Sequence, residues 1–224
     1  MVALALAFAA CSSSSGPSDD STALPSAPAL LQRSAQQMKT VRSARFDLRV
    51  NGTIAGVAVK KAVGIITSDG KASGTVDIEE GGSLVEIDLI VANGTIYVKG
   101  PTGTYLPLPS GLTGGLFDPS KILSPTGGLS ALLESAKDGK TVREEKVGGV
   151  DTYRVTAILD ANLLGKLMPL PSAQSVPGTL WIGKDTPYLY RITVDTTQPG
   201  EQNPTELTLT LSGFGVPADI TPPS

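Results

Sequence analysis

Apolar and polar residues alternate through Ser83–Lys99, and this alternation is the clearest local pattern in the chain. Val85, Ile87 and Leu89 fall on one side of an extended strand and acidic residues fall on the other, because successive side chains of a strand point to opposite faces. Asn93-Gly94 then supplies two residues that tolerate the positive φ angles of a tight turn. The segment therefore predicts a β-hairpin with one apolar face.

The same alternation recurs along most of the chain, with turn-forming residues between the apolar segments. In 46–54, the apolar residues keep one phase across Asn51-Gly52, which predicts one long strand rather than a turn. In 57–67, Lys61 falls in the apolar phase and indicates a β-bulge. Further strands are predicted around 74–78 and at 141–147, 152–159, 178–183, 188–195 and 205–212, and turns at 68–71, 80–82 and 148–149.

Other segments show helical spacing instead. Apolar residues recur every three or four positions within Ala29–Arg42, with polar residues between them. A membrane-surface role is an alternative for this helix, but its narrow apolar stripe lacks aromatic anchors, which favours packing against the sheet. A second helix is predicted at 129–136 and a short third one after Asp160. Residues 101–125, rich in Gly and Pro, are predicted to be mainly loop, with a capped turn at Asp118-Pro119.

The N-terminal residues differ in composition from the rest. Residues 1–10 are apolar and end at Cys11, and the segment that follows as far as Pro28 is rich in Ser, Pro and Asp. We interpret 1–10 as the end of an export signal that starts upstream of Met1, because the cationic start of a signal is missing. A buried helix is disfavoured here, since the run is short and abuts a polar segment. Phe8-Ala9-Ala10-Cys11 resembles a bacterial lipobox, so 11–28 is predicted to be a flexible tether acylated at Cys11.

Composition narrows the classes of function. The chain has 224 residues, of which 40% are hydrophobic and 17% charged, and this fits one domain at 29–220 with a sizeable core. The net charge of -3 and the lack of a basic cluster argue against a nucleic-acid partner. There is no histidine, and Cys11 is the only cysteine, which excludes an intrachain disulfide, a Cys/His zinc site and a histidine-based catalytic triad.

Short motifs in a fixed order carry a family resemblance over nearly the whole chain after Cys11. They are Cys11 itself, Val41-Arg42-Ser43-Ala44, Asn93-Gly94-Thr95-Ile96-Tyr97, Phe117-Asp118-Pro119, Ile122-Leu123, the stretch from Gly128-Leu129 to Leu132-Leu133, Val147-Gly148-Gly149-Val150-Asp151-Thr152, Thr179-Leu180-Trp181-Ile182 and Leu211-Ser212-Gly213-Phe214-Gly215. No single motif is specific, but their order and spacing together resemble the mycobacterial LppX/LprG lipoproteins, which are related in fold to the LolA/LolB carriers.

The resemblance implies an α+β fold, in which a strongly curved antiparallel sheet, a half-barrel, encloses an apolar cavity with helices on its concave side. It also implies a membrane-anchored envelope lipoprotein that binds acylated lipids or glycolipids and helps transport them across the cell envelope. The expected location is the outer, periplasm-facing side of the cell membrane. We expect a monomer, with an envelope lipid transporter as a candidate partner, and no cofactor apart from the acyl groups on Cys11 and the bound lipid.

The candidate cavity residues follow from the apolar faces and the resemblance together. Periodicity by itself indicates only that such residues face a core, and the resemblance favours a cavity lining for the set. The set consists of Val50, Val76, Ile78, Val85, Ile87, Leu89, Val91, Ile96, Val98, Leu132, Leu133, Leu180 and Ile182.

Two other functions are alternatives to the carrier. One is a surface lipoprotein that acts only as a protein-binding or structural module, with the sheet face filled by its own side chains. The other is an enzyme that uses a carboxylate pair, the candidates being Glu79-Glu80, Glu144-Glu145 and Glu86 with Asp88. Neighbouring residues of a strand point to opposite faces, and Glu86 and Asp88 share the face expected to meet solvent, so catalysis is disfavoured.

Overall fold

The computed structural model describes residues 23–52, 54, 58–101, 103–108, 119–167, 175–196 and 205–223. The described elements, in chain order, are α1 (Ala27–Met38), β1 (Ser43–Asn51), β2 (Val59–Thr67), β3 (Ala72–Glu80), β4 (Ser83–Ala92), β5 (Thr95–Lys99), β6 (Tyr105–Pro107), η1 (Pro119–Lys121), α2 (Leu129–Ser135), β7 (Lys137–Val147), β8 (Val150–Asp160), α3 (Ala161–Leu167), β9 (Ser175–Gly183), β10 (Leu189–Asp195) and β11 (Glu206–Ser212).

The strands form one antiparallel, eleven-stranded sheet in the order β6-β5-β4-β3-β2-β1-β11-β10-β9-β8-β7. The N-terminal strands and the C-terminal strands each follow one another as neighbours, and β1 joins the two groups by pairing with β11. Among the described residues, β6 and β7 have no partner strand on their outer sides, so this sheet is open and does not close into a barrel. This confirms the predicted α+β class with a large antiparallel sheet.

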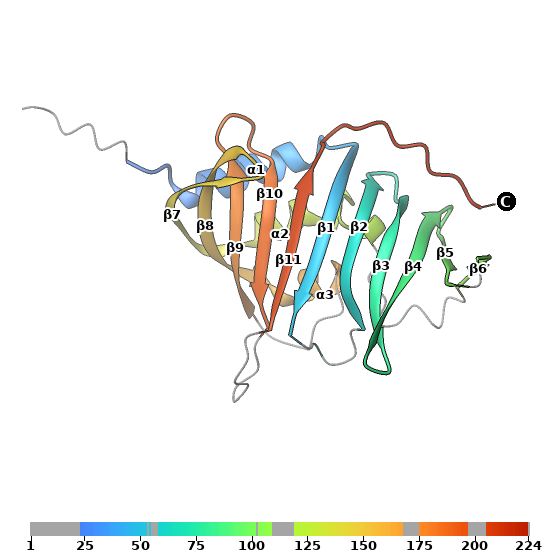
Figure 1. The fold of residues 1–224 in the computed structure, drawn as a ribbon. Coiled ribbons are helices and arrows are strands. Elements are labelled where there is room, and N and C mark those ends of the chain that lie inside the picture. Colours follow the sequence, from blue (N-terminus) through green and yellow to red (C-terminus); the bar gives the residue numbers. More distant parts are fainter. Residues whose placement is uncertain are drawn as a thin grey trace, which may run out of the picture.

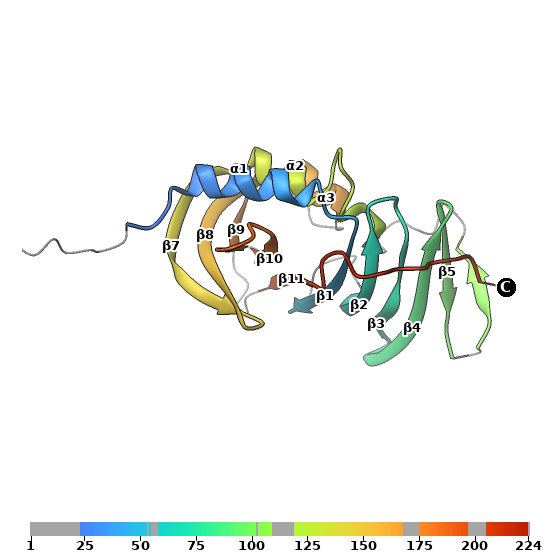
Figure 2. The ribbon, with the colours of Figure 1, turned by 90° about the horizontal axis from the view of Figure 1, so that it is seen from above.

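The helices lie together on the concave side of the curved sheet (Figure 2). α1 and α2 pack against each other and onto β7, β8 and β9, and α3 packs beside α2 and β8. The short helix η1 packs on β2. The predicted packing of the first helix against the sheet is therefore confirmed. None of the helices among the described residues is long and apolar enough to cross a membrane.

Several local predictions from the sequence are confirmed by the backbone. Asn93 and Gly94 both have positive φ angles, 54° and 74°, and they connect β4 to β5 as the hairpin pattern predicted. A register shift between Val59 and Lys61 shows the expected β-bulge of β2. At the start of α3, Asp160 Oδ1 accepts hydrogen bonds from the backbone N–H groups of Asn162 and Leu163, at 2.8 and 3.0 Å.

Other boundaries differ from the prediction. The long strand expected through Asn51-Gly52 is wrong, because β1 ends at Asn51 and Gly52 adopts a left-handed conformation with a φ of +81°. Ile54 is nevertheless buried. Its apolar side chain therefore packs in the core without belonging to the strand. α1 ends at Met38 rather than Arg42, because Thr40 N and Val41 N bond back to carbonyls three residues earlier. Asp118 and Val57 lie outside the described residues.

Candidate functional site

The strand residues predicted to line a cavity all share the concave face. The register pairs Val76 with Ile87, and Leu89 with Val98, so these four side chains point the same way. In the other group of strands, Val50 of β1 lies opposite Leu207 of β11. The registers of β11 with β10 and of β10 with β9 place Leu180 and Ile182 on the same face as this pair. The apolar residues of the separate strands therefore form one continuous apolar surface.

Under the helices, this surface forms a filled core. Leu180 and Ile182 are fully buried, and so are Leu132 and Leu133 of α2, with exposed fractions of 0 to 1%. They belong to one apolar cluster with the buried side of α1. In this half of the molecule the predicted residues therefore pack against protein side chains.

Beyond the helices, the same surface becomes accessible. Ile78, Val85, Ile87 and Val98 of β3 to β5 are only half-buried, although they point to the same face as the buried residues. None of the described helices covers β4, β5 or β6 (Figure 2). On the same strands, Val76, Leu89, Val91 and Ile96 are buried. This transition from a filled core to an accessible apolar wall is the candidate functional site, and an enclosed cavity over it remains a prediction.

Sequence reasoning missed two members of this wall, Leu106 and Leu108. Leu106 lies opposite Val98 in the β5–β6 pairing, so it faces the concave side, and Leu108 is half-buried against the core. Both fall in the segment predicted to be loop because of its Gly and Pro content. Their spacing of two residues around Pro107 was the signal that could have identified the strand.

Two grooves among the described residues lie away from this wall. One, of about 380 Å³, lies between α1, α2 and the start of β7 and is lined by Leu31 and Leu133 together with Gln32 and Gln36. The other, of about 620 Å³, runs along β7 to β11 and is lined mainly by threonines and by charged side chains. Leu133 is thus a predicted cavity residue that borders the first of these grooves.

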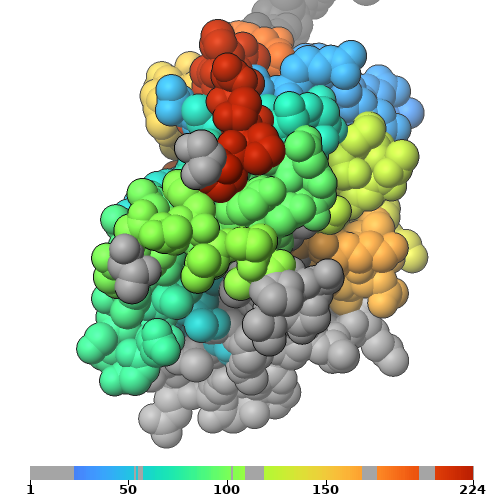
Figure 3. All heavy atoms as spheres, turned by 90° about the vertical axis from the view of Figure 1, so that its right-hand side faces the viewer, coloured from blue at the N-terminus to red at the C-terminus, as the bar shows by residue number. Residues whose placement is uncertain are grey.

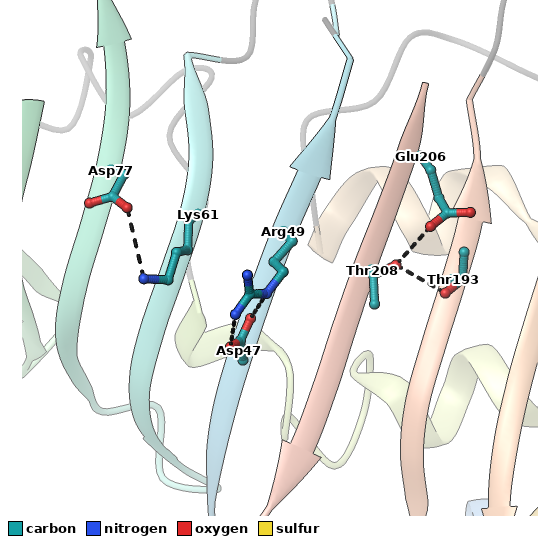
Figure 4. A network of polar contacts seen from close by, with 7 residues as sticks. All are labelled: Asp47, Arg49, Lys61, Asp77, Thr193, Glu206 and Thr208. Carbon is teal, nitrogen blue, oxygen red and sulfur yellow. Dashed lines mark hydrogen bonds and ion pairs between the residues drawn. The ribbon is translucent and has the colours of Figure 1, made fainter. Parts of the chain in front are cut away.

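The convex face is polar, and its charged groups contact one another. Arg49 Nε lies 2.9 Å from Asp47 Oδ1, and Lys61 Nζ lies 4.0 Å from Asp77 Oδ2 (Figure 4). In the same view, the hydroxyl of Thr208 lies 3.0 Å from that of Thr193 and 3.2 Å from a carboxylate oxygen of Glu206. These contacts identify the convex side as the solvent-facing side of the sheet.

The carboxylate pairs considered for catalysis are also engaged in ion pairs. The shortest N–O distances are 2.8 Å from Lys60 to Glu79, 2.7 Å from Lys184 to Glu144, 2.9 Å from Arg143 to Glu145 and 2.6 Å from Lys99 to Asp88.

The electrostatic environment of these carboxylates is that of ordinary surface ion pairs. The pKa of Lys99 is raised by its hydrogen bond to Asp88, and the pKa of Lys184 by its hydrogen bond to Glu144. Desolvation opposes ionisation of Glu145, but the nearby Trp181 N–H and Arg143 outweigh it and lower the pKa of Glu145. A general acid at neutral pH needs the opposite shift. Within the described residues no cluster of acidic or sulfur ligands suits a metal ion.

The comparisons with known proteins agree with this architecture. Residues 26–220 match the family model described as LppX_LprAFG lipoprotein, which spans the whole sheet and all the helices. The chain belongs to this family of lipoproteins. The family description names a lipoprotein, and the relatives given below are named as carrier proteins.

Individual members of the family match over most of their length. The protein named lipoarabinomannan carrier protein LprG from Mycolicibacterium smegmatis is 34% identical over 96% of this chain and 90% of its own. The protein of the same name from Mycobacterium tuberculosis is 31% identical over 80% of this chain and 75% of its own.

Two solved structures share the fold. The crystal structure of LprF from Mycobacterium bovis superposes with a TM-score of 0.77 at 22% identity, covering 88% of this chain and 97% of the other. The crystal structure of LppX from Mycobacterium tuberculosis gives a TM-score of 0.66 at 19% identity, covering 87% and 98%.

Proposed function

We propose that this protein is a membrane-anchored lipoprotein that binds acylated lipids or glycolipids against the concave face of its sheet and helps transport them across the cell envelope. The observation that carries the proposal is the apolar wall of β3 to β6, where Ile78, Ile87 and Val98 point to the concave side without being fully buried. Single exposed apolar residues are common on proteins, but a continuous exposed apolar surface marks a binding site. Membership of the lipoprotein family supports a lipid as the occupant.

The free energy of transferring acyl chains explains why such a wall is needed. Moving two acyl chains with about 30 methylenes from a membrane into water costs a free energy of roughly 24 kcal/mol, at about 0.8 kcal/mol per methylene. A lipid therefore crosses an aqueous compartment only when a protein shelters its chains. Aliphatic side chains on a concave surface supply that shelter, and aromatic residues, which would fill the space, make up only 4% of the chain.

The proposal extends to the glycolipid class and to the location. Relatives at 31 to 34% identity are named lipoarabinomannan carrier proteins, which supports a glycosylated, acylated lipid as the ligand here. Acylation of Cys11, which lies outside the described residues, would hold the domain at the outer face of the cell membrane. An envelope lipid transporter that accepts the lipid is the expected partner, and the carrier is expected to act as a monomer.

Native mass spectrometry of the protein purified from its own host tests the binding of lipid. We expect the folded domain to carry additional mass that extraction with organic solvent removes and that fragments to fatty acids. A folded protein with only its polypeptide mass would instead support a lipoprotein that binds proteins and no lipid.

Substitution on a single strand tests where the lipid binds. Ile87→Trp should reduce the bound lipid by at least about fivefold, because the indole fills space on the concave wall. Ile87 is preferable to its partner Val76, which is only 4% exposed and would tolerate a large ring poorly.

Glu86→Trp provides the matched control, since Glu86 is exposed on the convex face of the same strand. We expect it to bind as much lipid as the parent protein. Equal loading of Ile87→Trp, Glu86→Trp and the parent would contradict the concave binding site.

A further inference from the structure

Along one row of paired residues on the concave face, the exposure of the side chains increases toward one edge of the sheet. Leu89 and Val91 of β4 are buried, Val98 of β5 is half-buried, and Leu106 of the edge strand β6 is 60% exposed. The pairings of Leu89 with Val98 and of Val98 with Leu106 place all these side chains on one face. A continuous apolar track therefore leads from the core to the solvent at β6.

Leu84 shows that exposure alone does not define this track. It is 67% exposed, and it pairs with Glu79 in the β3–β4 ladder, one residue out of phase with the concave pair Ile78 and Val85. Leu84 therefore points to the convex face. The two leucines have nearly equal exposure and lie on opposite faces, so only Leu106 connects to the apolar wall.

Two other borders of the concave face are covered by described segments. At the opposite edge, α1 packs on β7, a strand rich in charged residues. Along the rim at the end of β11, the C-terminal tail crosses the sheet, held by a 2.9 Å hydrogen bond from Gly215 N to Ser43 O and by the buried Ile220 (Figure 1). Figure 3 looks onto the remaining edge, where β4 to β6 lie at the surface below this tail.

We propose that acyl chains enter and leave the binding site across the edge strand β6, with Leu106 as the first side chain that they contact. This inference rests on the proposed function and adds the route to it. An acyl chain that passes here meets apolar side chains at every step. The convex side of the same edge is polar, because Lys99 is ion-paired with Asp88 and lies over the ring of Tyr105. A lipid can therefore keep its polar headgroup in water while its chains slide over Leu106 onto Val98.

The test compares Leu106→Asp with Leu84→Asp in the full chain. Vesicles of phosphatidylcholine and phosphatidylglycerol that contain a self-quenched fluorescent phospholipid report uptake by the increase in fluorescence. The final lipid-to-protein ratio is measured in the same samples. We expect Leu106→Asp to slow uptake by about tenfold or more, because an acyl chain must pass an ionised carboxylate, and to leave the final ratio unchanged. Leu84→Asp should take up lipid within about twofold of the parent rate, as expected for a surface change far from the route.

Each outcome decides a different statement. Uptake by Leu106→Asp at the parent rate, or equal slowing by Leu84→Asp, would overturn the route and leave the binding function standing. Lack of uptake by the parent protein itself would overturn the function, and the route with it.

A chemical block removes any dependence on the folding of the aspartate variant. Leu106→Cys and Leu84→Cys are made in a full chain that carries Cys11→Ser, which leaves one thiol in each. A maleimide attached to polyethylene glycol is added to the folded proteins. We expect the label at position 106 to stop uptake and the label at position 84 to have no effect, and the reverse pattern would contradict the proposal.

Discussion

Two glycines facing each other show how single residues shape this sheet. Gly64 of β2 pairs with Gly74 of β3 on one side and with Phe46 of β1 on the other. A Cβ atom on Gly64 would lie 2.8 Å from the Cα of Gly74 and 3.0 Å from the Phe46 ring. Because neither glycine has a side chain, β2 and β3 approach each other closely here, and the ring of Phe46 packs over Gly64.

We predict that Gly64→Ala destabilises the fold by about 1 to 3 kcal/mol, because the added methyl group overpacks a contact made largely by backbone. Urea unfolding followed by circular dichroism measures the loss. Gly100→Ala is the control, since a Cβ atom there meets no other atom within 4 Å, and it should change the free energy of unfolding by less than about 0.5 kcal/mol. Equal midpoints for the two variants would show that the glycine pair carries no steric constraint.

Among the elements, α3 depends most visibly on one local interaction. It has only seven residues, and it follows β8 directly. Asp160 satisfies two of its free backbone N–H groups, and Leu164 and Leu167 bury its apolar side. A helix this short is unstable in isolation, so the cap and the core contacts together hold it in place.

We predict that Asp160→Ala lowers the free energy of unfolding by about 1 kcal/mol, the usual cost of losing an N-cap side chain. Asp160→Asn keeps an oxygen acceptor and should stay within about 0.5 kcal/mol of the parent. Thermal or urea unfolding of the three proteins provides the comparison. An alanine variant as stable as the parent would mean that packing alone defines the start of α3.

At the scale of the whole molecule, the N-terminal segment joins the domain far from β6. Thr141 of β7 donates a hydrogen bond of 2.7 Å from its hydroxyl to the carbonyl of Pro25, just before α1. This contact lies at the β7 end of the sheet, opposite to the edge formed by β6 (Figure 2). The proposed membrane anchor and the proposed lipid route therefore leave the domain at opposite ends.

We predict that Cys11→Ala releases the protein from membranes into the soluble fraction. Stable anchoring to a membrane needs more than one acyl chain or an additional basic segment. The Ser- and Pro-rich segment after Cys11 has no cluster of basic residues that could replace the acyl groups. Fractionation of cells, followed by immunoblotting, measures the distribution, with Ser12→Ala as the control that should remain in the membrane fraction. Persistent membrane association of Cys11→Ala would refute the anchor.

Local features followed from the amino-acid sequence: most of the strands, the tight turn at Asn93-Gly94, the bulge near Lys61 and the apolar side of each element. These features depend on neighbouring residues, so a period of two or a turn-forming pair is enough to predict them. The same alternation gave a wrong prediction at Gly52. The strand ends before this residue, although the buried Ile54 keeps the spacing of the strand's apolar residues.

Which part of the apolar face is filled depends on how elements distant in the sequence pack together. Ile182 and Ile87 have the same character in the sequence, yet one is fully buried near the helices and the other is half-exposed on β4. The difference arises because α1, α2 and α3 pack on strands distant from β3 to β6 in the sheet order, and because β1 pairs with β11 across most of the chain. Contacts between residues so far apart leave no trace in a local pattern, and they decide which apolar residues remain accessible to a lipid.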